Sequence, residues 1–117
     1  MPLFNFQKQF AADVESGRKR QTIRARRKIR PQVGQTAFLY TGTRTKACRK
    51  LGEAKIRVVA DVMIFAQGVV IGTTITIVRQ ADQDQFARAD GFKDWAEMRD
   101  WFANTHGLPF KGDLIKW

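Results

Sequence analysis

The sequence contains one cysteine, Cys48, and one histidine, His106, among its 117 residues. A single cysteine cannot form an internal disulfide, and two such residues are too few for a transition-metal cluster. They also leave no basis for a Ser-His-Asp triad, because the histidine is expected at a helix end in a structural role. We therefore expect no metal and no cofactor, and a reducing, cytoplasmic location.

Long apolar runs are absent as well. No stretch approaches the roughly 18 to 20 apolar residues that span a bilayer, so no membrane partner is expected. The first ten residues carry no apolar segment of the signal-peptide type. The phosphate-binding pattern GxxxxGK[ST], the dinucleotide-binding pattern GxGxxG and the zinc-binding pattern HExxH do not occur. With no repeat or linker, residues 1–117 are expected to form a single domain.

Acidic residues are absent from positions 16–52, and this one-third of the chain carries the whole charge excess. It holds twelve Lys and Arg, whereas the rest has nine basic against eleven acidic residues, for a net charge of +10. Like charges at this density repel, and a nucleic-acid backbone is the commonest counter-charge. A solvated basic surface is the alternative, and an anionic membrane is disfavoured because the run lacks an amphipathic helical face.

The RNA hypothesis names specific residues. Tyr40 and Trp95 are candidate stacking platforms, with core packing as the alternative for each. The candidate RNA-contacting cations are Arg18, Arg24, Arg26, Arg27, Lys28, Arg30, Arg44, Lys46 and Arg49.

Hydrophobic periodicity predicts short strands and two main helices, one near each end of the chain. The first helix starts at residue 5 or 7 and ends near 16, where Gly17 suits a left-handed position. The second starts at Asp94, with Glu97 as its capping-box partner, and ends at Gly107. Expected strands cover residues 2–6, 17–26, 36–40, 55–65, 69–78 (as one or two strands) and 110–117.

Two segments are harder to interpret. Residues 46–51 are expected to hold a short helical turn, and residues 81–89 are expected to form a polar segment anchored by Phe86.

Short strands outnumber helices, so the pattern predicts an α+β domain with a small, closed or nearly closed β-barrel of about five to six strands.

The segment 17–24, Gly-Arg-Lys-Arg-Gln-Thr-Ile-Arg, is the most informative stretch. As a strand it places Thr22 and Arg24 on one face, with Lys19 beside them. A lysine in a partly dry pocket can act as a base, and a threonine hydroxyl can act as a nucleophile or orient a substrate. Asp90, just before the second main helix, can supply a carboxylate that positions water or holds a nucleobase amide.

This segment resembles the G-x-K-x-x-T-x-R signature of the ASCH domain, a PUA-like β-barrel family linked to RNA. The strand at residues 34–40, the long strand at 55–65 and the stretch from Phe86 through Met98 fit the family's general order. The resemblance covers nearly the whole chain, although only the first motif is specific. It implies a PUA-like barrel.

The resemblance also implies an activity. Some small bacterial ASCH proteins are amidohydrolases that remove acetyl from N4-acetylcytidine with a Lys, a Thr and a Glu. Those positions fall on Lys19, Thr22 and Asp90, and the aspartate departs from the family by one methylene. A displacement of about 1 Å can cost on the order of a hundredfold in rate. Lys19, Thr22 and Asp90 are therefore the candidate catalytic residues, and whether the chain is an enzyme stays open.

Three functions remain in view. The preferred one is an RNA- or modified-nucleoside-binding module with a basic cleft, since a small neutral nucleoside does not call for twelve cations. The second is a hydrolase, acting either as an N4-acetylcytidine-type amidohydrolase or as a metal-independent ribonuclease. The third is an interaction protein, for example one encoded by a phage, that uses the basic face to block a nucleic-acid enzyme or to bind an acidic partner.

Overall fold

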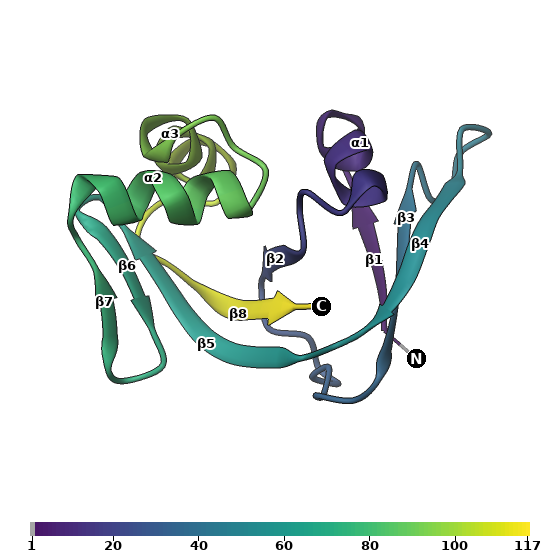
Figure 1. Ribbon diagram of the computed structural model, residues 1–117, viewed down its shortest axis with the longest axis horizontal. Coiled ribbons are helices and arrows are strands. Elements are labelled where there is room, and N and C mark those ends of the chain that lie inside the picture. The colour runs from purple at the N-terminus through teal and green to yellow at the C-terminus, as the bar shows by residue number, and fades with distance from the viewer. Residues whose placement is uncertain (1) are drawn as a thin grey trace.

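The computed structural model describes residues 2–117, and its elements belong to the α+β class (Figure 1). The described residues contain three helices, α1 (Lys8–Ser16), α2 (Gln80–Ala89) and α3 (Trp95–Thr105). They also contain the eight strands β1 (Leu3–Phe6), β2 (Gln21–Arg24), β3 (Thr36–Thr41), β4 (Arg49–Lys55), β5 (Val58–Phe65), β6 (Gly68–Ile71), β7 (Ile75–Ile77) and β8 (Phe110–Lys116).

The strands form two hydrogen-bonded sheets. One has three strands in the order β1-β3-β4, and the other has five in the order β2-β8-β5-β6-β7. All neighbours are antiparallel except β1 and β3, which are parallel. Helix α1 packs against the three-stranded sheet, while α2 and α3 pack together beside the five-stranded sheet (Figure 1).

A short joint connects the two sheets. Strand β4 leads into β5 through Ile56 and Arg57, with the Ile56 amide bound to Gln35 O at 2.9 Å and the Arg57 amide bound to Lys116 O at 2.8 Å. The predicted α+β class is confirmed. The sheets are not closed into one barrel, and the eight strands exceed the five or six expected.

Several expected elements differ from the observed ones. The strand expected at 17–26 is shorter, because only Gln21–Arg24 pair with β8. The strand expected at 55–65 is interrupted, since residue 55 ends β4 and β5 starts at Val58. The helical turn expected within 46–51 is wrong, because Arg49–Lys55 pair with β3 across a bulge. The polar segment near 81–89 is helix α2, so two main helices are an undercount.

The predicted helix ends are confirmed. Gly17 adopts the left-handed conformation at φ 83° after α1, and Gly107 does so at φ 82° after α3. The Asp94 side chain accepts a hydrogen bond from the Glu97 amide at 2.9 Å. The Glu97 carboxylate in turn accepts from the Lys93 amide at 2.9 Å, one residue before the position that a capping box requires.

The core draws on both sheets and on all three helices. Its most deeply buried members include Phe4 of β1, Ile64 of β5, Met98 and Phe102 of α3, and Leu114 of β8. No helix among residues 2–117 combines the length and the apolar character that crossing a membrane would need. The expected cytoplasmic location stays a prediction.

Candidate functional site

A cavity of about 300 Å³ lies where α1 and β2 meet the segment after α2 and the end of α3. Lys19, Thr22 and Asp90 all border it. Lys19 and Asp90 are 71 positions apart in the sequence, so the packing of α2 and α3 beside the five-stranded sheet is what brings the carboxylate to the lysine.

Lys19 is held against Asp90 at one end of the cavity. Its Nζ donates to the main-chain oxygen of Asp90 at 2.5 Å and lies 3.5 Å from the carboxylate oxygen Oδ1. The same Oδ1 accepts a hydrogen bond from Gln21 Nε2 at 3.2 Å. The Lys19 ammonium also lies 5.1 Å from the ring centre of Phe10 and 5.7 Å from that of Phe6, which provide cation–π contacts.

Burial dominates the electrostatics of this pair. Both side chains are almost fully enclosed, at 3% and 6% exposure. Burial lowers the pKa of Lys19 and raises the pKa of Asp90, because each charged form loses hydration, while their mutual attraction opposes both shifts. The two pKa values therefore move toward each other.

Thr22 is oriented by its neighbour on the same strand. Arg24 Nε donates to Thr22 Oγ1 at 2.9 Å, and Arg24 Nη2 donates to Asn5 O of β1 at 2.8 Å. Burial, and secondarily the charge of Arg27, lowers the pKa of Arg24 to about 10. Since the Thr22 oxygen already accepts from a guanidinium, its hydroxyl hydrogen remains to donate to a ligand.

Much of the remaining cavity lining is aromatic, and one of its rings, Phe10, also contacts Lys19. Phe10 and Phe92 meet edge to face with ring centres 5.2 Å apart, Phe92 lies 5.7 Å from Trp101, and Trp101 lies 5.7 Å from His106. All four residues border the cavity. Such a lining can receive a planar ring, since aromatic faces and edges attract one another.

Sequence reasoning missed several of these residues. Gln21 is not among the predicted site residues, yet its amide donates a hydrogen bond to the Asp90 carboxylate. His106 was given only a structural role at a helix end, but it also borders the cavity. Gly91 allows close packing, because a Cβ there would lie 3.0 Å from Lys19 Cδ and 3.0 Å from Phe10 Cδ1. The sequence shows a glutamine two residues after Lys19 but not its burial, so no local pattern marks it as a partner of Asp90.

The predicted RNA-contacting cations have different surroundings. Arg26 and Arg30 both bind Asp61 of β5 and Asp113 of β8, and Asp113 is 1% exposed. These two aspartates face each other across the β5–β8 pair, where the arginines relieve their repulsion. The hydrogen bond to Asp113 and the charge of that carboxylate raise the pKa of Arg26, with smaller contributions from Asp61.

Other predicted cations are also engaged within the fold. Arg27 Nη2 donates to Leu3 O at 2.7 Å and stacks 4.5 Å from the Phe4 ring centre, and burial lowers its pKa. Arg49 pairs with Glu15 at 2.7 Å and Arg18 approaches Asp13 at 3.6 Å. Among residues 16–52, the cations with no side-chain partner in the described part of the chain are Arg20, Lys28, Arg44 and Lys46.

The two candidate stacking residues differ in exposure. Trp95 is buried at 6% exposure within the core, as its core-packing interpretation predicts. Tyr40 is partly exposed on β3. Neither borders the cavity.

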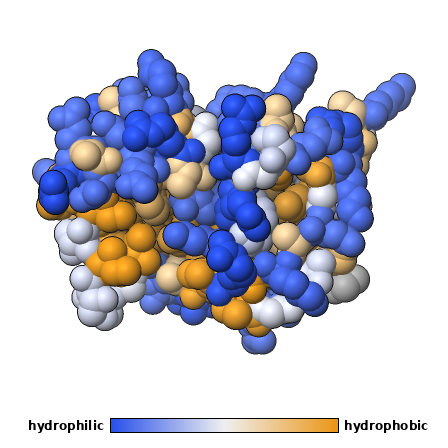
Figure 2. Space-filling model, in the orientation of Figure 1, coloured by the Kyte–Doolittle hydropathy of each residue, from blue (hydrophilic) through white to orange (hydrophobic). Residues whose placement is uncertain are grey.

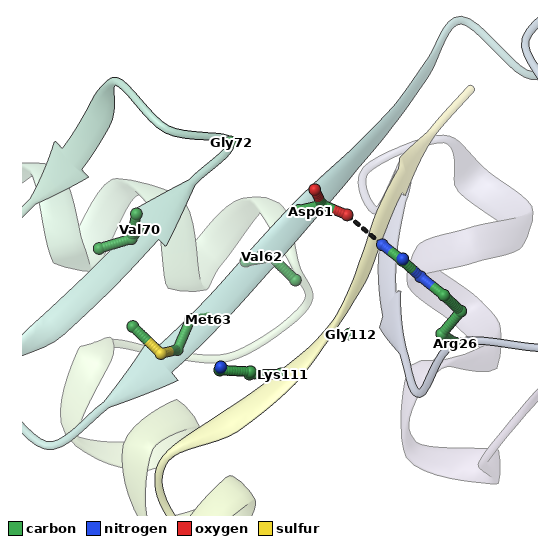
Figure 3. Close-up of a pocket in the computed structure, with 8 residues that line it drawn as sticks. All are labelled: Arg26, Asp61, Val62, Met63, Val70, Gly72, Lys111 and Gly112. Atoms are coloured by element: carbon green, nitrogen blue, oxygen red, sulfur yellow. Dashed lines mark hydrogen bonds and ion pairs between the residues drawn. The ribbon is translucent and has the colours of Figure 1, made fainter.

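A larger hollow of about 500 Å³ lies elsewhere, over β5, β6 and β8 (Figure 3). Met63 and Val70 form apolar walls, Lys111 lies beside them, and the Arg26–Asp61 ion pair closes the far side. Figure 2 shows hydrophobic side chains over the β5 to β7 region and strongly hydrophilic ones along the middle of the same face. The smaller cavity is the better candidate site because Lys19, Thr22 and Asp90 meet there.

Within residues 2–117 no three His, Cys, Asp or Glu side chains gather in a way that could hold a metal ion. Comparison of the chain with protein-family models, with curated proteins and with solved structures found no match.

Proposed function

We propose that this chain is an ASCH-like domain that binds a pyrimidine nucleobase, free or within RNA, in the cavity between α1 and α3. The observation that carries the proposal is the meeting of Lys19, Thr22 and Asp90 at one cavity that is also lined by aromatic rings. A volume of about 300 Å³ is at the small end of ligand pockets and suits a base better than a larger cofactor.

The polar end of the cavity supports a cytosine-like ligand. The Thr22 hydroxyl is available as a donor for a ring nitrogen. Asp90 Oδ2 has no side-chain or amide donor within residues 2–117 and can accept from an exocyclic amine. A donor and an acceptor that line the same cavity suit the amine edge of cytosine better than the carbonyl edge of uracil, since a mismatch leaves buried polar groups unpaired.

The fold part of this proposal is a PUA-like barrel whose halves are the two sheets. Two features support it. Strand β4 continues almost directly into β5, and Arg24 and Arg27 donate to main-chain oxygens of β1. The seam of this barrel, meaning the boundary between β1 and the segment that begins with β2, would then be closed by arginine side chains and not by hydrogen bonds between paired strands.

Calorimetric titration with cytidine, N4-acetylcytidine and uridine tests the binding proposal. We expect cytidine-type ligands to bind more tightly than uridine, and Thr22→Val to weaken them about tenfold through loss of one hydrogen bond. Thr76→Val, on exposed β7, is the matched control and should change nothing. Absence of binding by all three nucleosides, or equal affinity of Thr22→Val and the wild type, would overturn the proposal.

Deacylation of N4-acetylcytidine is the second candidate, favoured by the lowered pKa of Lys19 beside an oriented hydroxyl. Neutral Lys19 would accept a proton from water as the water oxygen bonds to the acetyl carbon. The bond from that carbon to N4 then breaks and the proton passes to N4, giving acetate and cytidine. Thr22 would donate to the acetyl oxygen, and Asp90 would hold the departing amine.

Release of cytidine, followed by chromatography, tests this activity. We expect Lys19→Met to abolish release, and activity that survives this change would exclude Lys19 as the base.

Incubation with labelled single-stranded RNA without metal tests the ribonuclease alternative. Recovery of a protein partner without RNA from a pull-down would favour the interaction-protein alternative.

A further inference from the structure

We infer that the hairpin between β3 and β4 is a phosphate-binding element, and that the cavity therefore receives a base within a single-stranded polynucleotide. This inference rests on the proposed function, because it presumes that a nucleobase occupies the cavity. It adds the form of the ligand and a second contact surface, neither of which the cavity alone determines.

The hairpin carries two of the few uncommitted cations in the basic stretch. Arg44 and Lys46 are exposed, and neither has an acidic partner within residues 2–117. The neighbouring Arg49, at the base of the hairpin, is paired with Glu15 of α1. The fold thus neutralises the cation nearest the body of the protein and leaves the two at the tip available for an external anion.

The tip is held in one conformation by its own hydrogen bonds. Thr45 Oγ1 donates to Gly42 O at 2.6 Å and accepts from the Ala47 amide at 3.1 Å. Arg44 adopts a left-handed backbone at φ 67°, which is uncommon for a residue with a side chain. A Cβ at Gly42 would lie 2.8 Å from Ala47 O, so the backbone at residue 42 and the backbone at residue 47 lie too close together for any side chain. A backbone fixed in this way needs little further ordering when the tip meets a ligand, so the remaining cost is that of the two side chains.

Asn5 joins this tip to the cavity. Its side-chain oxygen accepts a hydrogen bond from the Thr43 amide at 3.0 Å, and its main-chain oxygen accepts from Arg24 at 2.8 Å. Asn5 itself borders the cavity. The hairpin and the Thr22–Arg24 end of the cavity are therefore fixed to the same residue, which sets the position of one relative to the other.

The arrangement requires a ligand with several linked units. The hairpin projects at the end of the molecule away from α2 and α3, whereas the cavity lies between α1 and α3 (Figure 1). A single nucleoside in the cavity has no phosphate with which to reach Arg44 or Lys46. A single strand can place one base in the cavity and a neighbouring phosphate at the hairpin, which Asn5 connects to the cavity.

Fluorescence polarisation with a single-stranded RNA of about eight nucleotides tests the inference, because single-strand sites span roughly 4 to 16 nucleotides. The probe carries one central cytidine in oligouridine, and free cytidine is titrated in parallel by calorimetry. We expect Arg44→Gln with Lys46→Gln to weaken RNA binding about tenfold at low salt and to leave cytidine affinity unchanged. The salt dependence should fall by about 1.4 in logarithmic slope, about 0.7 for each lost phosphate contact.

The matched control is Lys93→Gln with Lys111→Gln, which removes the same charge from exposed positions outside the basic stretch. Equal losses in the two double variants, or RNA that binds no more tightly than cytidine, would overturn the hairpin's role. If cytidine fails to bind the wild type while RNA binding still depends on Arg44 and Lys46, the cavity proposal fails and the phosphate contact stands.

Discussion

The pair formed by Lys19 and Asp90 is the most constrained feature at the scale of single residues. Each group is nearly enclosed, and the main-chain oxygen of Asp90, its carboxylate and the amide of Gln21 leave few ways to rearrange. A buried ion pair is weak evidence for stability, because desolvation offsets the attraction. Its position beside a cavity fits the ligand-binding role proposed for this site.

Removal of one partner is expected to be costly. Asp90→Asn leaves the Lys19 ammonium buried without a counter-charge, so we expect the free energy of unfolding to fall by about 3–5 kcal/mol. Urea denaturation followed by fluorescence measures this change. The double variant Lys19→Met with Asp90→Asn should recover much of the loss, since it buries no charge. A single variant as stable as the wild type would mean that the pair is not buried in solution.

The pH dependence of any deacylation follows from the direction of the Lys19 shift. A base must be neutral, and burial lowers the pKa of Lys19 below its ordinary value of 10.5. The neutral fraction grows as pH rises, so kcat/KM should increase with pH and level off above the lysine pKa, at a midpoint below 10.5. Initial rates across pH 6 to about 10 test this expectation. A rate that declines over that range would remove Lys19 from the role of base.

At the scale of elements, the seam between β1 and the segment after β2 is the unusual feature. Strand β1 pairs with β3 on one edge only, and Arg24 and Arg27 donate to two of its main-chain oxygens. These guanidiniums also stack on Phe4 and Phe6 of β1. Side chains therefore satisfy the edge that a neighbouring strand would otherwise cover.

Arg27→Met tests the seam while keeping most of the apolar stem. The variant loses the hydrogen bond to Leu3 O and the contact with the Phe4 ring. We expect a loss of about 1 kcal/mol in the free energy of unfolding, because the arginine is partly exposed and water compensates in part. Lys28→Met is the control, since Lys28 is exposed and has no side-chain partner in the described residues. Equal stabilities of the two variants would show that the seam contributes little.

At the scale of the whole molecule, the charge excess is less available than the sequence suggests. Six of the twelve cations in residues 16–52 pair with acidic side chains, and Arg24 and Arg27 bind β1. Exposed pairs can open for a stronger anion, but those with Asp113 have a buried partner. The surface therefore offers a few uncommitted cations in place of a continuous basic track.

The salt dependence of RNA binding should reflect this internal pairing. Four uncommitted cations predict a slope of log affinity against log salt of about −3, whereas twelve phosphate contacts would give about −8. Titrations of a single-stranded RNA at several salt concentrations measure the slope. A slope near −8 would mean that the arginines of the Asp61–Asp113 cluster exchange their partners for phosphate.

Local patterns in the sequence predicted the features that depend on neighbouring residues. Gly17 ends α1, Asp94 begins α3 and the β-branched alternation gives β5, because each depends on backbone conformation or on the polarity of adjacent positions. The sequence pattern did not predict helix α2, because its polar sequence buries only Gln83, Phe86 and Ala87. The sequence pattern did not predict strand β4 either, because its charged residues have low strand propensity and form a strand only through hydrogen bonds to β3.

The sequence by itself determined the α+β class, the excess of positive charge and the segment that carries Lys19 and Thr22. The tertiary structure decided that Asp90 meets Lys19, that Asp61 and Asp113 bind two of the arginines, and that the sheets stay distinct. The physical reason is that charge pairing and enclosure depend on contacts between residues far apart in the chain. Composition counts the charges, and only the packing of the elements determines which of them remain free for a ligand.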